Sequence, residues 1–266
     1  MYPDDKTWWG SLQVPMGTAT RLRIGPATIL LERLESEWHI ATESSDDSDD
    51  ATLDLEAPAH DCDLLARARV RRFGVAGRAQ TLTLSARLAD RPVVAAPAEP
   101  VLLPPGEILT VYMGSPVWIH VEAADPRREL CEMALLQPAD TWFGPNPRVG
   151  ELCYASRTHY RLRLDELPYR PHRAITSVLV ENRASTPLLL ESLKLPVTHL
   201  ALFGTADGRL WTQDVTLSRD DEHELTPLRV RRGAPKQAEN ATRIADARQP
   251  IADNIMVRAF SSLFPL

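Results

Sequence analysis

The chain has few cysteines, few lysines and no long uncharged apolar run. Its three cysteines, Cys62, Cys131 and Cys153, are odd in number, far apart and free of any C-x-x-C pair. This pattern disfavours a disulfide framework and a zinc knuckle. No apolar run approaches the roughly 18 residues that a membrane-spanning helix needs, and the acidic start MYPDDKTWWG does not resemble a secretory signal. We therefore expect a cytoplasmic protein with no membrane insertion.

The net negative charge is concentrated in one segment. Five acidic residues lie in ESSDDSDD, residues 43–50, and without them the net charge rises from −6 to −1. A nearly neutral body argues against nucleic acid as a partner. We interpret the acidic segment 43–50 as a solvated, mobile hairpin loop. Calcium binding is the alternative, but the segment lacks the glycine and the ligand order of an EF-hand loop.

The familiar catalytic motifs are missing. There is no G-x-S-x-G, no P-loop, no G-x-G-x-x-G and no H-E-x-x-H. The tetrad HDCD, residues 60–63, could supply two or three metal donors, but the start of a polar loop is the simpler interpretation. The sequence therefore predicts no catalytic residue, no cofactor and no metal.

What is present is period-2 alternation of apolar and polar residues, which is typical of half-buried strands. It is clearest in TRLRIG, TLTLSARL, VWIHVEA and YRLRLDEL. The 22 prolines recur between apolar runs and favour many short segments. We predict an all-β protein, an antiparallel β-sandwich. Further candidate strands are 27–33, 37–42, 51–56, 65–72, 107–114, 130–136, 174–182, 187–193, 197–204, 209–217 and 224–232.

The proline-rich stretch 91–107 suggests a division of the chain. We predict an N-terminal β unit over 1–95, which carries the acidic segment, and a C-terminal sandwich unit over 96–266; one domain over 1–266 is the alternative. Near the C-terminus, Met256, Phe260, Leu263 and Phe264 recur at helical spacing. They predict a short helix over 254–264 packed on the sheet.

The stretch 141–160 is the densest in chemistry-bearing residues. On a strand, Glu151, Cys153, Arg157 and His159 would share one face as a polar row, with Leu152 and Tyr154 on the apolar face. Arg157 or His159 could lower the thiol pKa, and His159 could act as a base. A straight strand would however hold Cys153 and His159 roughly 20 Å apart. A solvent-facing polar row beside a buried thiol is the simpler interpretation.

Aromatic residues raise a similar choice. The segment TWFGPNPRVG, residues 141–150, reads as a loop because of its prolines and glycines. Trp142 and Phe143 could stack on a sugar or base, as could Trp211 in RLWTQDV. More often such a pair anchors a loop into the core.

Several stretches together resemble a known family. They are PVLLPPGEILTVYMGSPVWIHVE, TWFGPNPRVGELCYASRT, RAITSVLVENRASTPLLLESLKLPVTHLALF and RLWTQDV. They are similar to an uncharacterised prokaryotic family catalogued as domain of unknown function 432, and TWFG…GELCYA is the most specific element. The resemblance brings no activity, cofactor or catalytic residue. It implies an accessory role near a membrane, because genes of the family neighbour those of mechanosensitive channels.

Three functions follow, in order of preference. The first is a non-catalytic module that binds a partner protein, which could be membrane-associated, or that self-associates. The second is a carbohydrate- or small-ligand-binding module that uses Trp142, Phe143 or Trp211. The third is a cysteine-dependent enzyme built on Glu151, Cys153, Arg157 and His159.

Overall fold

The structure is a computed structural model that describes residues 6–59, 66, 70–75, 80–146, 148–221, 226–250 and 256–260. Strands are the dominant regular structure of these residues, so the prediction of an all-β protein is confirmed. Apart from the single α-helical residue Ala66, the helical elements in this part of the chain are single 3-10 turns at Leu164–Glu166, Val197–His199 and Lys236–Ala238. No helix in it is long and apolar enough to cross a membrane.

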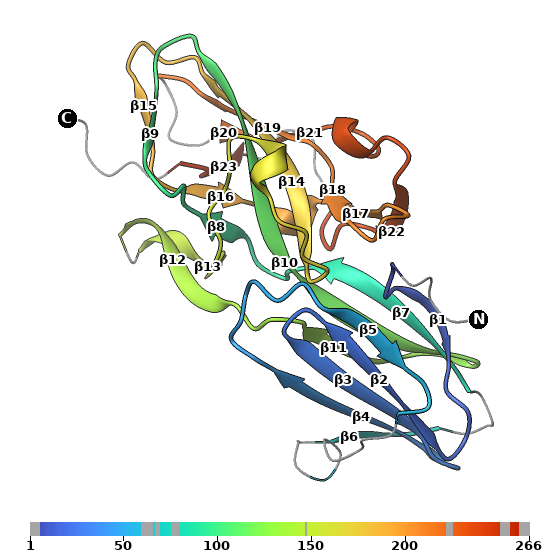
Figure 1. The fold of residues 1–266 in the computed structure, drawn as a ribbon. Helices are drawn as coiled ribbons and strands as arrows, with labels where there is room; N and C mark the ends of the chain where they lie inside the picture. The colour runs from blue at the N-terminus through green and yellow to red at the C-terminus, as the bar shows by residue number, and fades with distance from the viewer. Residues whose placement is uncertain are drawn as a thin grey trace.

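The first part of the chain contributes strands to two sheets (Figure 1). One is five-stranded, in the order β5-β2-β3-β4-β6; the other contains β1, β7, β10 and β11. The bounds are β1 Gly10–Gln13, β2 Thr18–Ile24, β3 Ala27–Arg33, β4 Glu37–Ser44, β5 Leu53–Glu56, β6 Arg71–Gly74, β7 Thr81–Leu88, β10 Ile108–Ala124 and β11 Arg127–Ala134. Apolar residues of both sheets, such as Ile29 and Leu84, belong to one buried cluster.

The long strand β10 joins this part to the rest of the molecule. Its second half pairs with β7 and β11, and its first half pairs with β14, so one ten-stranded sheet runs through the protein (Figure 1). The remaining strands are β8 Val93–Ala95, β9 Val101–Leu103, β12 Ala139–Asn146, β13 Val149–Ala155, β14 Arg173–Asn182, β15 Leu188–Leu190, β16 Leu193–Leu195, β17 Leu202–Gly204, β18 Leu210–Thr212, β19 Val215–Arg219, β20 Thr226–Pro227, β21 Arg229–Val230, β22 Thr242–Ala245 and β23 Met256–Val257.

Several predicted strands coincide with observed ones. The ranges 27–33 and 81–88 match β3 and β7, and 174–182 falls one residue short of β14. The ranges 107–114 and 117–123 fuse into β10. The pairing is antiparallel except for β13 with β8 and β14 with β18 and β19. Long connections separate these three pairs along the chain, which makes parallel pairing feasible. The sandwich arrangement and the division near residue 95 stay predictions.

Two predicted elements are wrong. The helix expected over 254–264 is absent from the described part of that range: Met256 and Val257 pair with β20, and Phe260 forms a bridge to Leu193. The neighbouring strands offer backbone partners, as when the Lys194 N–H donates to the Ala259 carbonyl, and this overrides the helical spacing. The strand expected over 160–164 is only a bridge at Arg161 followed by a 3-10 turn.

Candidate functional site

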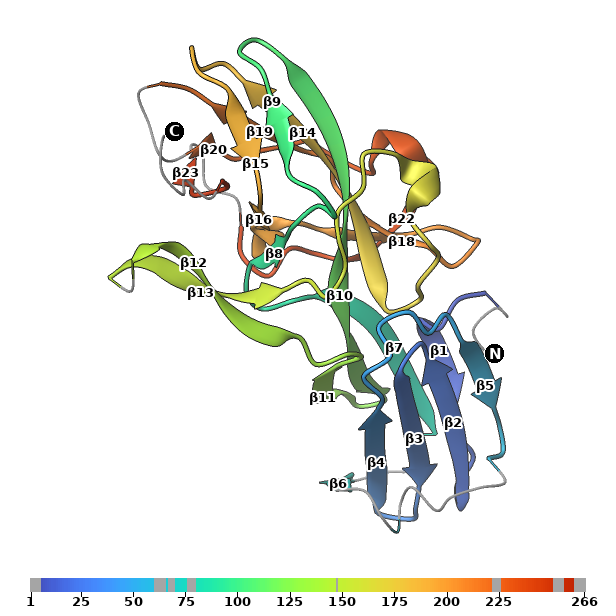
Figure 2. The same ribbon diagram turned by 60° about the vertical axis from the view of Figure 1, so that its left-hand side comes forward.

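Strands β12 and β13 form a hairpin that extends away from the rest of the chain (Figure 2). The interpretation of 141–150 as a loop is therefore wrong; the two halves of this segment pair, with Trp142 opposite Leu152. Gly144 permits the close approach, since its φ is +156° and a Cβ there would lie 2.3 Å from the Val149 carbonyl oxygen. The hairpin has a register shift near its tip, between Phe143 and Asn146.

The outer face of the hairpin is apolar and exposed. Trp142 and Leu152, which lie opposite each other across the hairpin, keep 47% and 44% of their surface open to solvent, and Val149 near the tip keeps 48%. The Trp142 ring lies over Gly150, where an added Cβ would come within 2.6 Å of the indole Nε1. The expectation that Trp142 anchors a loop in the core is wrong, and so is the expectation that Leu152 faces inward. The hairpin extends beyond the core that could cover them.

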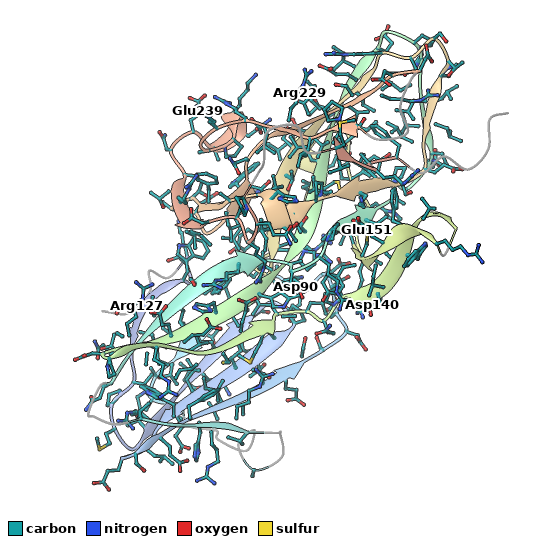
Figure 3. The ribbon with its side chains drawn as sticks, turned by 180° about the vertical axis from the view of Figure 1, so that it is seen from behind. Asp90, Arg127, Asp140, Glu151, Arg229 and Glu239 are labelled. Atoms are coloured by element: carbon teal, nitrogen blue, oxygen red, sulfur yellow. The ribbon has the colours of Figure 1, made fainter. Side chains whose placement is uncertain are left out.

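The inner face of the hairpin surrounds a buried cation. Lys194 of β16 is 3% exposed; its Nζ lies 2.8 Å from a Glu151 carboxylate oxygen and 5.6 Å from the centre of the Phe143 ring. Phe143 is 5% exposed, so it does serve as a core anchor. Glu151 lies on the hairpin in Figure 3 and compensates the charge of Lys194.

Cys153 lies on this inner face but is not activated. It is fully buried, and burial together with the nearby Glu151 carboxylate raises its pKa to about 12, although Lys194 acts in the opposite direction. Its thiol donates weakly to Glu151 Oε1 at 3.8 Å. Because a nucleophilic cysteine needs a stabilised thiolate, this geometry does not support the thiol as a nucleophile.

The predicted polar row does not form. His159 follows the end of β13, and its Nδ1 lies 3.3 Å from the carbonyl oxygen of Ala96. Arg157 turns to the acidic segment 43–50, where it contacts Asp46 at 3.1 Å. The structure thus brings together Phe143, Glu151 and Cys153, and places Arg157 and His159 elsewhere. The chain bends out of the strand after Ala155, so the alternation from 151 to 159 does not persist.

Trp211 lies far from the hairpin, in β18. It is 4% exposed and belongs to a small buried cluster with Leu167, Ile175 and Phe203. It also lines an open groove together with Tyr112, Leu162 and Gln237. Its indole N–H has no hydrogen-bond partner within the described residues. Trp142, Phe143 and Trp211 therefore form no common aromatic platform.

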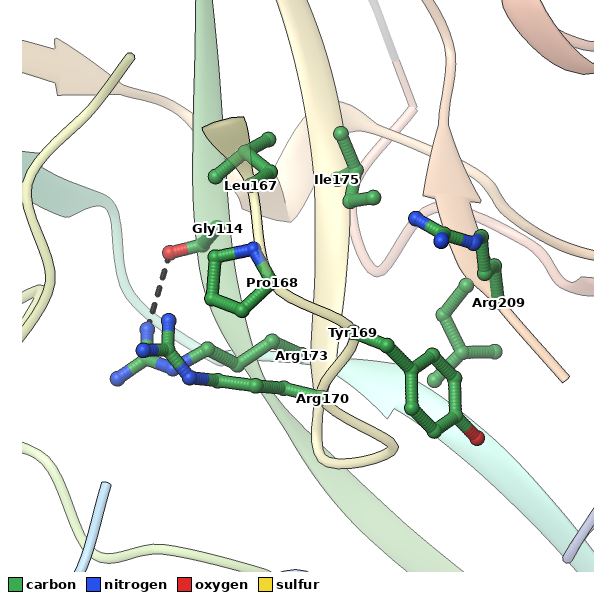
Figure 4. Close-up of a pocket in the computed structure, with 9 residues that line it drawn as sticks. Gly114, Leu167, Pro168, Tyr169, Arg170, Arg173, Ile175 and Arg209 are labelled. Carbon is green, nitrogen blue, oxygen red and sulfur yellow. Dashed lines mark hydrogen bonds between the residues drawn. The ribbon is translucent and has the colours of Figure 1, made fainter. Parts of the chain in front are cut away.

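Sequence reasoning missed one cluster, built from the segment YRPHR at 169–173. Arg170 and Arg173 line a small pocket with Gly114 and Pro168, and their guanidinium groups lie close together in Figure 4. The pocket volume of about 20 Å³ holds roughly one water molecule. In the sequence, this cluster could have been suspected from Arg170 and Arg173 on either side of His172. The approach of Arg157 to them depends on the fold.

Neither metal ligands among the described residues nor similarity to curated or solved proteins indicates a function. Within the described residues, no group of three or more histidine, cysteine or acidic side chains could hold a metal ion. The tetrad HDCD at 60–63 lies outside these residues. No curated protein and no solved structure matches the chain.

The family assignment covers nearly all of the sequence, including the hairpin and the arginine cluster. Residues 8–264 match the family described as Protein of unknown function (DUF432), and the chain belongs to that family.

Proposed function

We propose that the protein is a non-catalytic interaction module whose hairpin β12–β13 docks against the same hairpin of a second copy. The observation that carries this proposal is the apolar pair Trp142 and Leu152 on the outer face, with Val149 near the tip of the hairpin, each almost half exposed. Contiguous exposed apolar side chains on a protruding element are typical of interaction sites. The buried, unactivated Cys153 removes the main support for an enzyme.

The place of β12 in its sheet favours a second copy as the partner. The four-stranded sheet runs β12-β13-β8-β16, so β12 is an edge strand that can accept another strand. Antiparallel pairing of β12 with its symmetry mate gives a closed two-fold contact. Pro145 and Pro147 lack N–H groups and would confine the pairing to Ala139–Gly144. Trp142 lies within that range, so the two outer faces would meet along the new sheet.

Sedimentation velocity over a concentration series tests this proposal. The wild-type chain should show a monomer–dimer equilibrium, and the variant Trp142→Ser/Leu152→Ser should remain monomeric. The matched control is Leu102→Ser/Ile108→Ser, because both residues are exposed apolar side chains on other strands. The control should dimerise like the wild type. A wild-type chain that stays monomeric at its highest soluble concentration would rule out self-association through the hairpin.

A small-ligand module is the second candidate, favoured by the groove beside Trp211. Its lining combines aromatic, amide and charged side chains, with Tyr112, Arg209 and Asp207 among them, and the Trp211 N–H has no partner in the described part of the chain. Such a mixture suits a sugar. Quenching of tryptophan fluorescence by an oligosaccharide panel tests it: a response present in the wild type and lost in Trp211→Phe would support the groove.

We also propose two face-packed β units and a cytoplasmic location. The single hydrophobic cluster shared by residues of both N-terminal sheets supports sandwich packing there. The free, buried thiols Cys131 and Cys153 suit a reducing compartment. A cytoplasmic protein of this kind can also bind a membrane-associated partner. Vesicle fractionation of cells that produce the protein would separate a freely dissolved pool from a membrane-bound one.

A further inference from the structure

We propose that Arg157, Arg170 and Arg173 form a binding site for a phosphate-type oxyanion, and that carboxylates of the acidic segment 43–50 occupy this site in the present structure. The three arginines come from the end of β13, the turn before β14 and the start of β14. The acidic segment reaches them from the connection between β4 and β5.

Arg173 gives the first support. It is 5% exposed, and its guanidinium donates to the Gly114 carbonyl at 3.0 Å and to Ser156 Oγ at 3.3 Å. No carboxylate of the described residues lies within ion-pair distance of it, and its Nε has no partner there. Burial, then the charge of Arg170, lowers the pKa of Arg173 to about 10. A buried cation without a counterion is unfavourable, so the site is incomplete.

Arg170 and Arg157 extend the site toward solvent. The Arg170 side chain is 13% exposed and pairs with Asp49, while its Nε has no partner in the described part of the chain. Figure 4 shows the guanidinium groups of Arg170 and Arg173 side by side, against the repulsion of like charges. Arg157, 33% exposed, contacts Asp46. The exposure of the three arginines therefore decreases from Arg157 at the surface, through Arg170, to Arg173 in the interior.

The acidic segment 43–50 contacts the arginines through weak ion pairs. Asp46 and Asp49 are 98% and 73% exposed at the side chain, so water screens their ion pairs strongly and each contributes little. The base of the segment is fixed: the Thr52 N–H donates to Asp50, and the Gly25 N–H donates to the Thr52 carbonyl. Rotation of the Asp46 and Asp49 side chains can therefore take their carboxylates away from the arginines while the backbone of the segment stays attached.

The chemistry of the site selects a phosphate group. Arginine binds phosphate and carboxylate through directed N–H pairs. Here two separate carboxylates form the ion pairs: Asp46 pairs with Arg157, and Asp49 pairs with Arg170. A tetrahedral dianion carries the same charge on one small group and can reach several donors at once. His172, buried beside the arginines, stays neutral, because burial and then Arg173 and Arg170 lower its pKa to about 3.

Calorimetric titration with inorganic phosphate tests the site, at ionic strength held constant with sodium chloride. The variant Asp46→Asn/Asp49→Asn should bind phosphate at least ~10-fold more tightly than the wild type, because the internal competitor is gone. The matched control is Asp47→Asn/Asp54→Asn. It removes two negative charges from exposed positions nearby, and neither carboxylate forms an ion pair with any of the three arginines.

Further variants and a second probe make the result decisive. Adding Arg157→Gln and Arg170→Gln to the Asp46→Asn/Asp49→Asn chain should abolish the gain; both residues are partly exposed, so folding should survive. Flotation with phosphatidic acid vesicles, against phosphatidylcholine vesicles, identifies a lipid source: a gain there alone assigns the phosphate to a headgroup. No gain with either probe, or an equal gain in Asp47→Asn/Asp54→Asn, would overturn the proposal. Dimerisation is measured separately, so the two proposals fail independently.

Discussion

Trp118 and Trp142 both lie on strands with alternating neighbours, yet their surroundings are opposite. Trp118 is in the middle of β10, where β7 and β11 flank it, and it is 8% exposed. Its ring centre lies 5.6 Å from that of Tyr154. Trp142 is on the edge strand β12 and is 47% exposed. The sequence pattern led us to expect a polar face around Trp118 and a core anchor at Trp142.

The difference shows that a strand's own pattern does not fix which faces are covered. From Val117 to Val121, β10 is buried on both faces, including His120 at 3% exposure. The polar side chains on the second face are compensated by neighbours, as Arg87 and Arg248 contact Glu132 beside His120. On the outer face of the hairpin, the described residues leave Trp142 and Leu152 almost half exposed.

Trp118→Ala should produce the largest loss of stability. Removing a buried aromatic side chain typically costs about 3–5 kcal/mol, and Tyr154 would lose its ring contact. Urea unfolding followed by circular dichroism measures the change, with Trp118→Phe as the control that keeps most of the packing. A loss below about 1 kcal/mol would mean that the second face of β10 is not tightly packed.

Acid should weaken the junction between the two parts, where the Val117 N–H donates to the His172 carbonyl. The pKa of His172 falls from 6.5 to about 3 in the folded chain, chiefly through burial and then through Arg173 and Arg170, against Ser48 and Asp50. The unfolded chain therefore binds the proton more strongly, and stability is lost as pH falls from 6.5 toward 3.

Between pH 7 and pH 5 this single group should cost roughly 2 kcal/mol of unfolding free energy. Unfolding curves at both pH values, compared with those of His172→Gln, isolate its share. Proton NMR provides an independent check: the His172 imidazole signal should not titrate above pH 4 in the native protein. A titration midpoint near 6.5 would contradict the buried, neutral state.

Glu151→Gln should have an intermediate effect on the inner face of the hairpin. It leaves the ammonium group of Lys194 buried without its carboxylate, which we expect to cost about 1–3 kcal/mol. The double variant Glu151→Gln/Lys194→Met should recover most of that loss, because no unpaired charge remains. A double-mutant cycle measures the coupling. Equal stability of all four chains would show that the pair contributes nothing.

Trp142→Ala should change the free energy of unfolding least, within about 0.5 kcal/mol, because its ring is already half exposed. The same variant should weaken self-association, so stability and dimerisation separate at this residue. Thermal unfolding at low protein concentration, where dimers dissociate, is the measurement. A loss of several kcal/mol would place Trp142 in a covered environment and remove the hairpin's outer face from consideration.

Local pattern was sufficient for much of the secondary structure. Strands β3 and β7 follow from alternation alone, because apolar residues at every second position can only share a face in an extended chain. The hairpin could have been found from Gly144 and Gly150 between two aromatic or apolar stretches, but its prolines favoured a loop. The C-terminal residues had helical spacing, yet β16 and β20 provided backbone partners that the sequence does not reveal.

Three properties can be read directly from the amino-acid sequence: the chain is β-rich, it belongs to its family, and it carries a concentrated acidic segment. These properties depend on residue type and on neighbours within a few positions. The tertiary structure alone decided that Cys153 is buried, that Trp142 is exposed and that Arg157 meets Asp46 rather than His159. Burial and charge pairing arise between residues far apart along the chain, as with Arg170 and Asp49, and alternation carries no information about such distant partners.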